Sequence, residues 1–387
     1  MNDLGDTPNR ALLPPGFTDT LAPKAMREAA AVSAILTHFA AFGFVQVKPP
    51  LVEFEETLFG GIGSSKRDQS FRVMDPVSRQ MLAVRPDMTV QIARIAASRL
   101  AGEPRPLRLS YAGQVLRVTA GQVRPERQFT QLGAEIIGAG GVVVDTHIIS
   151  LAVRALGLIG IGGVSVDLSV PGLITSILPN LMSPGPDSAD LAKAIEGKDV
   201  ATVAQLSGDK SKLIIALINA GGPADEALAS VSELSLPVAG REMIDRLAAT
   251  VRGLERTIPD TALTIDFVER RGFEYQSGVS FTLFAKSLRE ELGRGGGYMA
   301  GEEFGSAEPA SGVSLFMDSI LRGLPGEDEP KRVLVPHDLT ASDAADLHHQ
   351  GWTTVYALED GLVGSDEAKR QGCSHMLLGS KINPVEG

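Results

Sequence analysis

The chain has 387 residues, of which 43% are hydrophobic and 21% are charged, so it is long enough to bury a substantial core in two domains. The formal net charge of −11 disfavours nucleic acid as a partner, because a polyanion is repelled unless a local basic patch overrides the overall charge. The single cysteine, Cys373, excludes an internal disulfide framework and a cysteine-based metal cluster, and it fits a reducing cytoplasm.

The amino-terminal segment has no apolar core of the signal-peptide type, and its prolines would interrupt one. No uncharged apolar run in the sequence reaches the roughly 18 to 20 residues that a membrane-spanning helix needs. We therefore expect a soluble cytoplasmic protein with no membrane partner.

The first 140 residues predict one helix followed by strands. Gly43 supplies a helix stop after a run of apolar residues at helical spacing, namely Met26, Ala30, Ile35, Leu36, Phe39 and Phe42. The segment FVQVKPPLVE alternates apolar and polar residues before Pro49-Pro50, which predicts a strand that ends at, or lies along, a sheet edge. Alternation typical of half-buried antiparallel strands continues in FRVMD, QMLAVRP, LRLSYAGQVLRV and RQFTQLGAEIIG.

The remaining chain predicts three further regions. Ala- and Leu-rich stretches with Gly, Pro and Ser between them indicate a helical insertion from about 173 to 259. Strand patterns resume in LTIDFVE and GVSFTLFA, before a glycine-rich turn at 293–297 and a helix from about 311 to 323. After the linker candidate GLPGEDEPK, residues 331–387 read as strand, helix, strand, helix, strand. This alternation predicts a small parallel α/β unit that docks on the main body.

Several patterns of known chemistry are incomplete in this sequence. GGIGSSKR, at 60–67, lacks the glycine before and the hydroxyl residue after the lysine of a phosphate-binding loop. The six histidines have no metal-ligand spacing, and no Gly-x-Ser-x-Gly nucleophile motif occurs. An Asp-Asp pair of the kind that holds phosphoribosyl pyrophosphate is also missing. We therefore expect no catalytic residues, no metal site and no cofactor.

Arginines and carboxylates lie within or beside the predicted strands, where an unpaired charge costs several kcal/mol. Each of them alone could belong to a structural ion pair. Together they could line a polar pocket in which carboxylates suit an ammonium or imidazolium group and an arginine suits a carboxylate or phosphate. The segments are Arg85–Thr89, Arg117, Arg127–Gln131, Glu135 and Arg271–Tyr275.

From about Leu13 to Leu324 these segments resemble histidyl-tRNA synthetase and, more closely, the ATP phosphoribosyltransferase regulatory subunits derived from it. FGFVQVKPPLVE resembles the class II dimerisation motif, and LSYAGQVLR with RQFTQLGAE resembles the second class II motif. RPDMT and RRGFEYQSGVSF resemble the family's Arg-Pro-acid-x-Thr and Arg-Gly-x-x-Tyr signatures. The resemblance implies an α/β (α+β) fold: a class II synthetase-like antiparallel sheet flanked by helices over 1–324. Residues 331–387 resemble a truncated anticodon-binding domain.

The resemblance also implies a histidine-like pocket. Asp87, Thr89 and Gln131 would face the α-amino group, and Glu135 would lie toward the imidazole. Arg271 would meet the carboxylate, and Tyr275 and Tyr298 would close the walls. Arg117 would stand in the place of the synthetase's phosphate-binding arginine, and Arg127 belongs to the same set. The alternative is a retained scaffold without a ligand.

Departures from the family pattern indicate that adenylation is lost. The third synthetase motif ends in an arginine that holds ATP, whereas SGVSLFMDSIL has Ser319 at that place and Phe316 where a glycine is expected. A hydroxyl cannot supply that charge, and an aromatic ring could fill the nucleotide space. Pro125 stands near an expected arginine, and Gly297 replaces another usual arginine. Gln276 stands where a second tyrosine is usual, which puts strict imidazole recognition in doubt.

The resemblance therefore implies a regulatory subunit that is not itself an enzyme. It would form a homodimer and a hetero-oligomer with a short-form catalytic ATP phosphoribosyltransferase subunit, in the first step of histidine biosynthesis. Histidine would be its effector. Two alternatives stay open: a working histidyl-tRNA synthetase, and a synthetase paralogue that serves as a different binding module.

Overall fold

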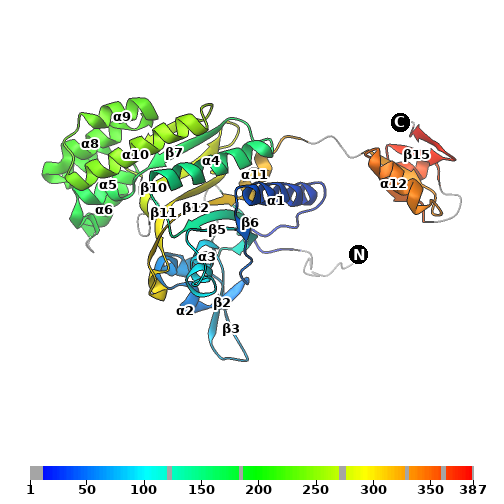
Figure 1. The fold of residues 1–387 in the computed structure, drawn as a ribbon, viewed down its shortest axis with the longest axis horizontal. Helices are drawn as coiled ribbons and strands as arrows, with labels where there is room; N and C mark the ends of the chain where they lie inside the picture. The colour runs from blue at the N-terminus through cyan, green and yellow to red at the C-terminus, as the bar shows by residue number, and fades with distance from the viewer. Residues whose placement is uncertain are drawn as a thin grey trace, which may run out of the picture. The chain divides into compact units, whose positions relative to one another are not determined.

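The computed structural model describes residues 12–119, 124–182, 186–269, 276–326, 331–358 and 363–385. The chain divides into two compact units, Met1–Leu324 and Pro325–Gly387. The described part of the first unit contains a nine-stranded sheet in the order β1-β5-β6-β12-β11-β10-β7-β9-β8 (Figure 1). Its strands are β1 (Val45–Gln46), β5 (Leu107–Leu116), β6 (Gln128–Ile137), β7 (Val164–Ser169), β8 (Gly222–Pro223), β9 (Ala262–Asp266), β10 (Gln276–Ala285), β11 (Gly293–Ala300) and β12 (Glu308–Phe316).

Most neighbouring strands of this sheet are antiparallel, as the alternating sequence patterns predict, while the pairs β1–β5 and β7–β9 are parallel. The two faces of the sheet pack into two different hydrophobic cores. Strand β12 contributes to both, because successive side chains point to opposite faces. Val313 and Leu315 belong to one core cluster, whereas Ala310 and Phe316 belong to the other.

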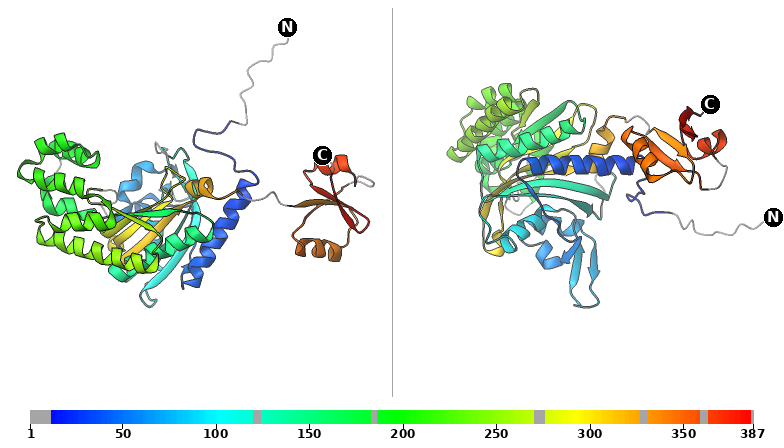
Figure 2. Two further views of the ribbon diagram at one scale, coloured as in Figure 1. Left: turned by 90° about the horizontal axis from the view of Figure 1, so that it is seen from above. Right: turned by 45° about the vertical axis from the view of Figure 1, so that its right-hand side comes forward.

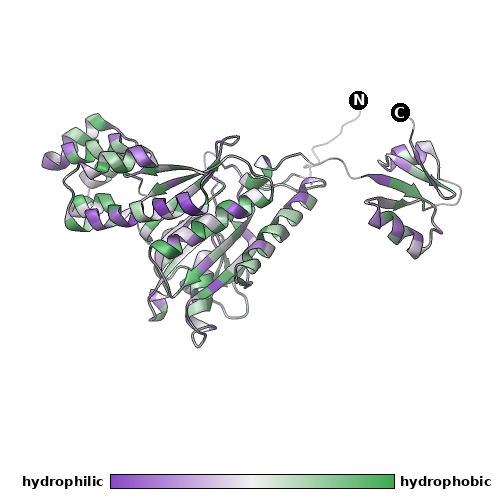
Figure 3. Cartoon of the chain, turned by 45° about the horizontal axis from the view of Figure 1, so that its top comes forward, coloured by the Kyte–Doolittle hydropathy of each residue, from purple (hydrophilic) through white to green (hydrophobic). Residues whose placement is uncertain are grey.

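The two faces are covered by different helices. The first face carries α1 (Lys24–Ala41), α4 (Val142–Leu158) and α10 (Val238–Thr257), whose apolar sides join one large core (Figures 1 and 3). The opposite face carries α3 (Thr89–Ser98), which buries Ile92, Ala93 and Ala96 in the second core. The candidate site lies on this second face.

Helix α1 forms where helical spacing predicts it, although its buried stripe is displaced from the expected one. The buried residues are Ala31, Ile35 and Phe39, which follow one another at intervals of four. Met26, in the first turn of the helix, is 68% exposed. Ala30 is also exposed, so the predicted stripe is wrong at its amino-terminal end.

The predicted helical insertion is confirmed between β7 and β9, and it gathers at that end of the sheet (Figure 2). Its last helix, α10, packs along α4. The two-residue strand β8 pairs with β9 and adds an edge that the sequence does not predict. The remaining elements are α5 (Gly172–Ile177), η2 (Pro179–Met182), α6 (Pro186–Glu196), α7 (Val200–Leu206), η3 (Gly208–Lys210), α8 (Ser211–Ala220) and α9 (Ala224–Ser232).

The segment 44–53, which predicts a strand that ends at or lies along a sheet edge, is divided between two sheets. Its first part is β1, beside β5, and its last part begins a separate three-stranded sheet. Pro49-Pro50 lie at the break, since proline has no N–H to give to a ladder. The small sheet has the order β2-β4-β3. Here lie β2 (Val52–Phe54), α2 (Glu55–Leu58), η1 (Gly61–Gln69), β3 (Arg72–Met74) and β4 (Met81–Val84).

The glycine-rich stretch 293–297 is not a turn, since it forms most of β11. A Cβ at Gly295 would lie 2.0 Å from the carbonyl oxygen of Gly312 and 2.6 Å from Cζ of Phe281, so close strand packing requires glycine there. Residues 311–316, expected to be helical, form the end of β12. The helix α11 (Met317–Gly323) begins only after them, and η4 (Glu302–Phe304) precedes β12.

The second unit has a four-stranded sheet in the order β14-β13-β15-β16. The first three strands are parallel, as predicted, whereas β16 is an additional antiparallel strand. Its elements are β13 (Arg332–Val335), α12 (Ala341–His349), β14 (Thr353–Tyr356), α13 (Ser365–Arg370), β15 (His375–Leu378) and β16 (Lys381–Pro384). Across both units, no helix that the structure describes is long and apolar enough to cross a bilayer.

Candidate ligand pocket

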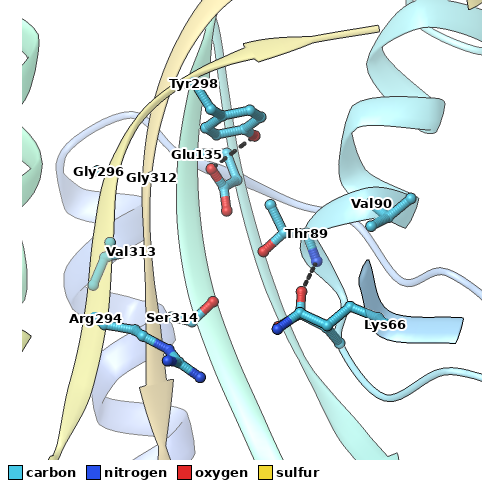
Figure 4. Close-up of a pocket in the computed structure, with 12 residues that line it drawn as sticks. Lys66, Thr89, Val90, Glu135, Arg294, Gly296, Tyr298, Gly312, Val313 and Ser314 are labelled. Carbon is cyan, nitrogen blue, oxygen red and sulfur yellow. Dashed lines mark hydrogen bonds between the residues drawn. The ribbon is translucent and has the colours of Figure 1, made fainter. Parts of the chain in front are cut away.

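A cavity on the α3 face of the main sheet brings together residues from four distant parts of the chain (Figure 4). They come from η1, from the segment that leads into α3, from β6 and from the paired strands β11 and β12. The lining residues are Lys66, Asp87, Thr89, Val90, Glu135, Arg294, Gly295, Gly296, Tyr298, Gly312, Val313 and Ser314. Four of the residues predicted for a histidine-like pocket, Asp87, Thr89, Glu135 and Tyr298, therefore line one cavity.

Glu135 is the buried acid of this cavity, with 1% of its surface exposed. Its Oε1 accepts a hydrogen bond from the Tyr111 hydroxyl at 3.2 Å, and its Oε2 accepts one from the Tyr298 hydroxyl at 3.0 Å. The paired residue on β12 is Gly312, where a Cβ would lie 1.6 Å from Oε2. Only glycine at this position leaves space for the carboxyl group.

Burial raises the pKa of Glu135 to about 8, although the hydrogen bonds from Tyr298 and Tyr111 act in the opposite direction. The pKa of each tyrosine is raised well above 10, first by burial and then by the charge of Glu135. At neutral pH the carboxyl group is therefore largely protonated. It can donate a hydrogen bond to a ligand nitrogen, or become an acceptor when a cation approaches.

Asp87 is held in position by its neighbours. Its Oδ1 accepts a hydrogen bond from the backbone N–H of Thr89 at 2.8 Å, and its Oδ2 accepts one from Nε2 of Gln131 at 3.3 Å. Gln131 is fully buried and also bonds the Met88 N–H and the Ser314 hydroxyl. Gln131 therefore supports Asp87 from behind and does not line the cavity itself.

Arg117 is not among the residues that line the cavity, and the described residues form no ion pair with its guanidinium. Its guanidinium lies 4.9 Å from the centre of the Phe129 ring, and its Nε reaches the carbonyl oxygen of Pro86 only at 3.5 Å. No carboxylate of the described residues is within 4.0 Å of it. Burial, with Arg124 and Arg294 nearby, lowers its pKa to about 10 although Asp87 and Glu291 act in the opposite direction, so the group remains charged at neutral pH. An anionic group of a ligand would complete this environment.

Arg124 also lies over the Phe129 ring, but it is paired with the carboxylate of Asp318. Its Nε and Nη2 each reach a carboxylate oxygen of Asp318 at 2.9 Å, and its guanidinium packs over Phe129 and Phe316. Phe316 is 1% exposed, so the aromatic ring fills space inside the fold. Ser319 is completely buried in α11 and its hydroxyl has no hydrogen-bond partner. The place expected for a nucleotide-binding arginine thus faces the interior.

The other expected residues are divided between distant and undescribed positions. Arg127 does not line the cavity, since its guanidinium packs over Phe17 and Phe71 and bonds the carbonyl oxygens of Arg117 and Pro15. Arg271 and Tyr275 lie outside the described residues, as does the side chain of Gln276. The sequence did not indicate Lys66, Arg294, Ser314 or the Arg124–Asp318 pair. An ion pair between residues 194 positions apart leaves no local pattern.

Comparison with known proteins places this geometry in a family. Residues 16–320 match the family model for histidyl-tRNA synthetase. The chain is 45% identical to an ATP phosphoribosyltransferase regulatory subunit from Rhodospirillum centenum, over 100% of this chain and 99% of the relative. It is 47% identical to the protein of that name from Paramagnetospirillum magneticum, over 98% and 100%.

Two solved structures share the fold. An ATP phosphoribosyltransferase regulatory subunit/histidyl-tRNA synthetase from Bacillus halodurans C has a TM-score of 0.80 at 23% identity, covering 95% of this chain and 97% of that one. Histidyl-tRNA synthetase from Nostoc sp. PCC 7120 has a TM-score of 0.77 at 18% identity, covering 95% and 91%. These likenesses confirm the class II synthetase-like fold.

Proposed function

This chain belongs to the ATP phosphoribosyltransferase regulatory subunits, within the histidyl-tRNA synthetase-like family, and from that premise we propose that it senses histidine through the cavity at Glu135. As a regulatory subunit it has no catalytic role of its own and serves histidine biosynthesis. Its partner is the catalytic ATP phosphoribosyltransferase subunit. On this proposal the partner is a short-form subunit that depends on this chain for activity and for inhibition by histidine.

The observation that carries the proposal is the distribution of charge across the cavity. Glu135 lies at the buried end of the cavity. Its pKa of about 8 lets the carboxyl group be either protonated or ionised near neutral pH, so it suits an imidazole ring. Asp87 offers a fixed carboxylate for an ammonium group. Arg117 does not line the cavity, but its Nε approaches the carbonyl oxygen of Pro86 beside Asp87, and it offers a cation with no described carboxylate within 4.0 Å, which suits a carboxylate. Histidine carries all three complementary groups, and Arg271 could add to the carboxylate site.

The neighbourhood of Arg124 supports binding without adenylation. In the resemblance, the second and third synthetase motifs supply arginines to ATP. Here Arg124 is neutralised by Asp318 and enclosed by Phe129 and Phe316, while Ser319 is buried. At Arg124 a triphosphate would therefore meet an occupied, internally neutralised surface, and only the neighbouring Arg117 keeps a charge that no described carboxylate pairs. The retained function is recognition of an amino acid.

Homodimerisation is supported by exposed apolar residues on β1, within the first motif, and on the small sheet that follows it; together these residues are the first-motif surface. Strand β1 is at the edge of the main sheet, and its Val45 is 66% exposed. The adjoining small sheet exposes Val73, Met74 and Val77. Exposed large apolar residues are typical of an interface when a partner covers them. We infer that a second copy of the chain covers them.

The C-terminal unit is proposed to be a reduced anticodon-binding domain that no longer binds RNA. Its three parallel strands with helices between them support the relationship. The net charge of −11 disfavours contact with an RNA backbone. The cytoplasm is the location that suits a subunit of a biosynthetic enzyme.

Inhibition requires that histidine bind one state of the assembly more tightly than another, since a ligand of equal affinity for both shifts nothing. The test is reconstitution. The chain is mixed with a purified short-form catalytic subunit, and ATP phosphoribosyltransferase activity is measured with and without histidine. The proposal expects a stable complex, activity that depends on this chain, and histidine inhibition that Glu135→Ala abolishes.

Histidine-dependent exchange of pyrophosphate into ATP by the chain alone would instead identify a working synthetase. Failure to associate with any phosphoribosyltransferase subunit would favour a different binding module. Inhibition that survives Glu135→Ala, in a complex that still assembles, would move the effector site elsewhere.

A further inference from the structure

A second cavity lies between α4 and α10, on the face of the sheet opposite Glu135. Its volume is about 330 Å³, which falls within the range of about 300 to 1,000 Å³ that is typical of small-molecule sites. Leu151, Gly253 and Thr257 are among its lining residues, with Phe42 at the end of α1. The lining is mainly apolar, with a few polar groups. None of the residues assigned to histidine belongs to it.

The cavity also has two arginines that the described carboxylates do not pair. Arg154 on α4 donates from Nη2 to the carbonyl oxygen of Thr257 at 2.8 Å, which fixes its guanidinium beside the end of α10. Arg256 occupies the last turn of α10. Neither forms an ion pair within the described part of the chain. The chain has a net charge of −11, so this pair of arginines makes the cavity a locally positive region on a negatively charged protein.

Two histidines at or near the cavity have lowered pKa values, in part because of the same positive charge. Burial, then Arg108 and Arg154, lowers the pKa of His147, and burial, then Arg154, lowers that of His38. No carboxylate is among the groups that act on either ring. The hydroxyl of Thr146, another lining residue, is buried without a hydrogen-bond partner. The cavity therefore offers positive charge and apolar walls, while the Thr146 hydroxyl is packed against Gly253 and is not accessible to a ligand.

Aromatic groups shape one wall. The rings of Phe42 and His147 lie 6.0 Å apart, and the His147 ring is stacked on Phe44 at 6.3 Å. A flat apolar group would pack against this wall, since aromatic surfaces favour such contacts. We propose that the cavity between α4 and α10 binds a small organic anion, with its planar body against Phe42 and Leu151 and its carboxylate or phosphate at Arg154 and Arg256.

The test uses anilinonaphthalene sulfonate, a planar organic anion whose fluorescence rises in apolar surroundings, with the full chain. We expect saturable binding, weakened about tenfold or more in the double variant Arg154→Gln/Arg256→Gln, because charge-assisted hydrogen bonds are lost. Val143→Trp should block the site, since Val143 lines the cavity from an exposed position. Arg252→Gln is the matched control, because this exposed arginine on α10 does not line the cavity.

Phenyl phosphate and phenylacetate are then used to displace the probe. Displacement by the first alone assigns a phosphate ester, by the second alone a carboxylate, and by both a general anion site. Equal probe affinity in the native chain, the double variant and Val143→Trp would overturn the proposal, as would the absence of displacement by either compound. Because histidine binding is measured separately, failure here leaves the pocket at Glu135 untouched.

Discussion

The Tyr298 hydroxyl donates a hydrogen bond to Oε2 of Glu135 at 3.0 Å, from a strand two positions away in the sheet. This contact fixes the acid at the bottom of the cavity, and Tyr111 holds its other oxygen. The buried acid is thus surrounded by hydrogen-bond donors but has no cation of its own. Its protonation consequently couples to folding and to ligand binding.

Replacement of Glu135 by Gln should remove a pH dependence of stability. The pKa of Glu135 rises from an ordinary 4.5 to about 8 on folding, so between these values the folded chain binds more protons than the unfolded chain. The contribution of Glu135 to stability is therefore largest at low pH and falls as the pH rises toward 8, by up to about 1.4 kcal/mol per pH unit. Urea unfolding of both proteins between pH 5 and pH 9 measures it. A constant difference between the two proteins across that range would contradict the assignment.

Gly312→Ala should damage both the fold and the pocket. The new methyl group would meet Oε2 of Glu135 and force the carboxyl group away, which costs about 1 to 3 kcal/mol of unfolding free energy. Gly157→Ala, within helix α4, is the matched control because a Cβ there meets nothing within 4 Å. It should be neutral or stabilising. Chemical denaturation compares the two, and equal effects would mean that Gly312 is not needed to accommodate Glu135.

Two arginines over one phenylalanine ring should respond in opposite directions to the same substitution. Arg124→Met leaves the buried Asp318 carboxylate unpaired, which should cost about 3 to 5 kcal/mol. Arg117→Met removes a partly buried cation that has no carboxylate partner, so the chain without ligand should gain about 1 kcal/mol, part of the gain being offset by the lost ring contact. Thermal unfolding tests both. A loss of stability in Arg117→Met would show that the cation is compensated in the free chain.

Charge placed on the first-motif surface should separate the proposed homodimer. Val45→Lys and Val73→Lys would bury an unpaired ammonium in the interface, and each should raise the dimer dissociation constant at least about tenfold. Val238→Lys is the control, since that residue is 78% exposed at the start of α10. Light scattering coupled to gel filtration gives the mass of each species. A native monomer, or a dimer unchanged in both variants, would exclude this surface.

The sequence predicted helices and strands correctly where apolar and polar side chains recur at helical or strand spacing. The alternation in β5 and β6 and the helical spacing in α1 were sufficient for this purpose. Strand β11 was not predicted because glycines have no side chain to alternate. The end of β12 was assigned to a helix because it is buried on both faces and so shows no alternation of apolar and polar residues. Both strands are specified by packing against distant neighbours, which a local pattern does not contain.

The pocket residues were indicated by motif resemblance and by the cost of placing charge on strands. Glu135 and Tyr298 meet in the fold although 163 positions separate them. The supporting role of Gln131 and the pairing of Arg124 with Asp318 depend on side-chain geometry, so only a structure could separate them from ligand contacts.

Calorimetric titration of histidine into the native chain, Glu135→Ala and the exposed control Glu103→Ala tests the central proposal most directly. We expect one site in the native chain and in Glu103→Ala, and an affinity reduced about tenfold or more in Glu135→Ala, since a buried hydrogen bond to the imidazole is lost. Unchanged histidine affinity in a folded Glu135→Ala protein would contradict the account.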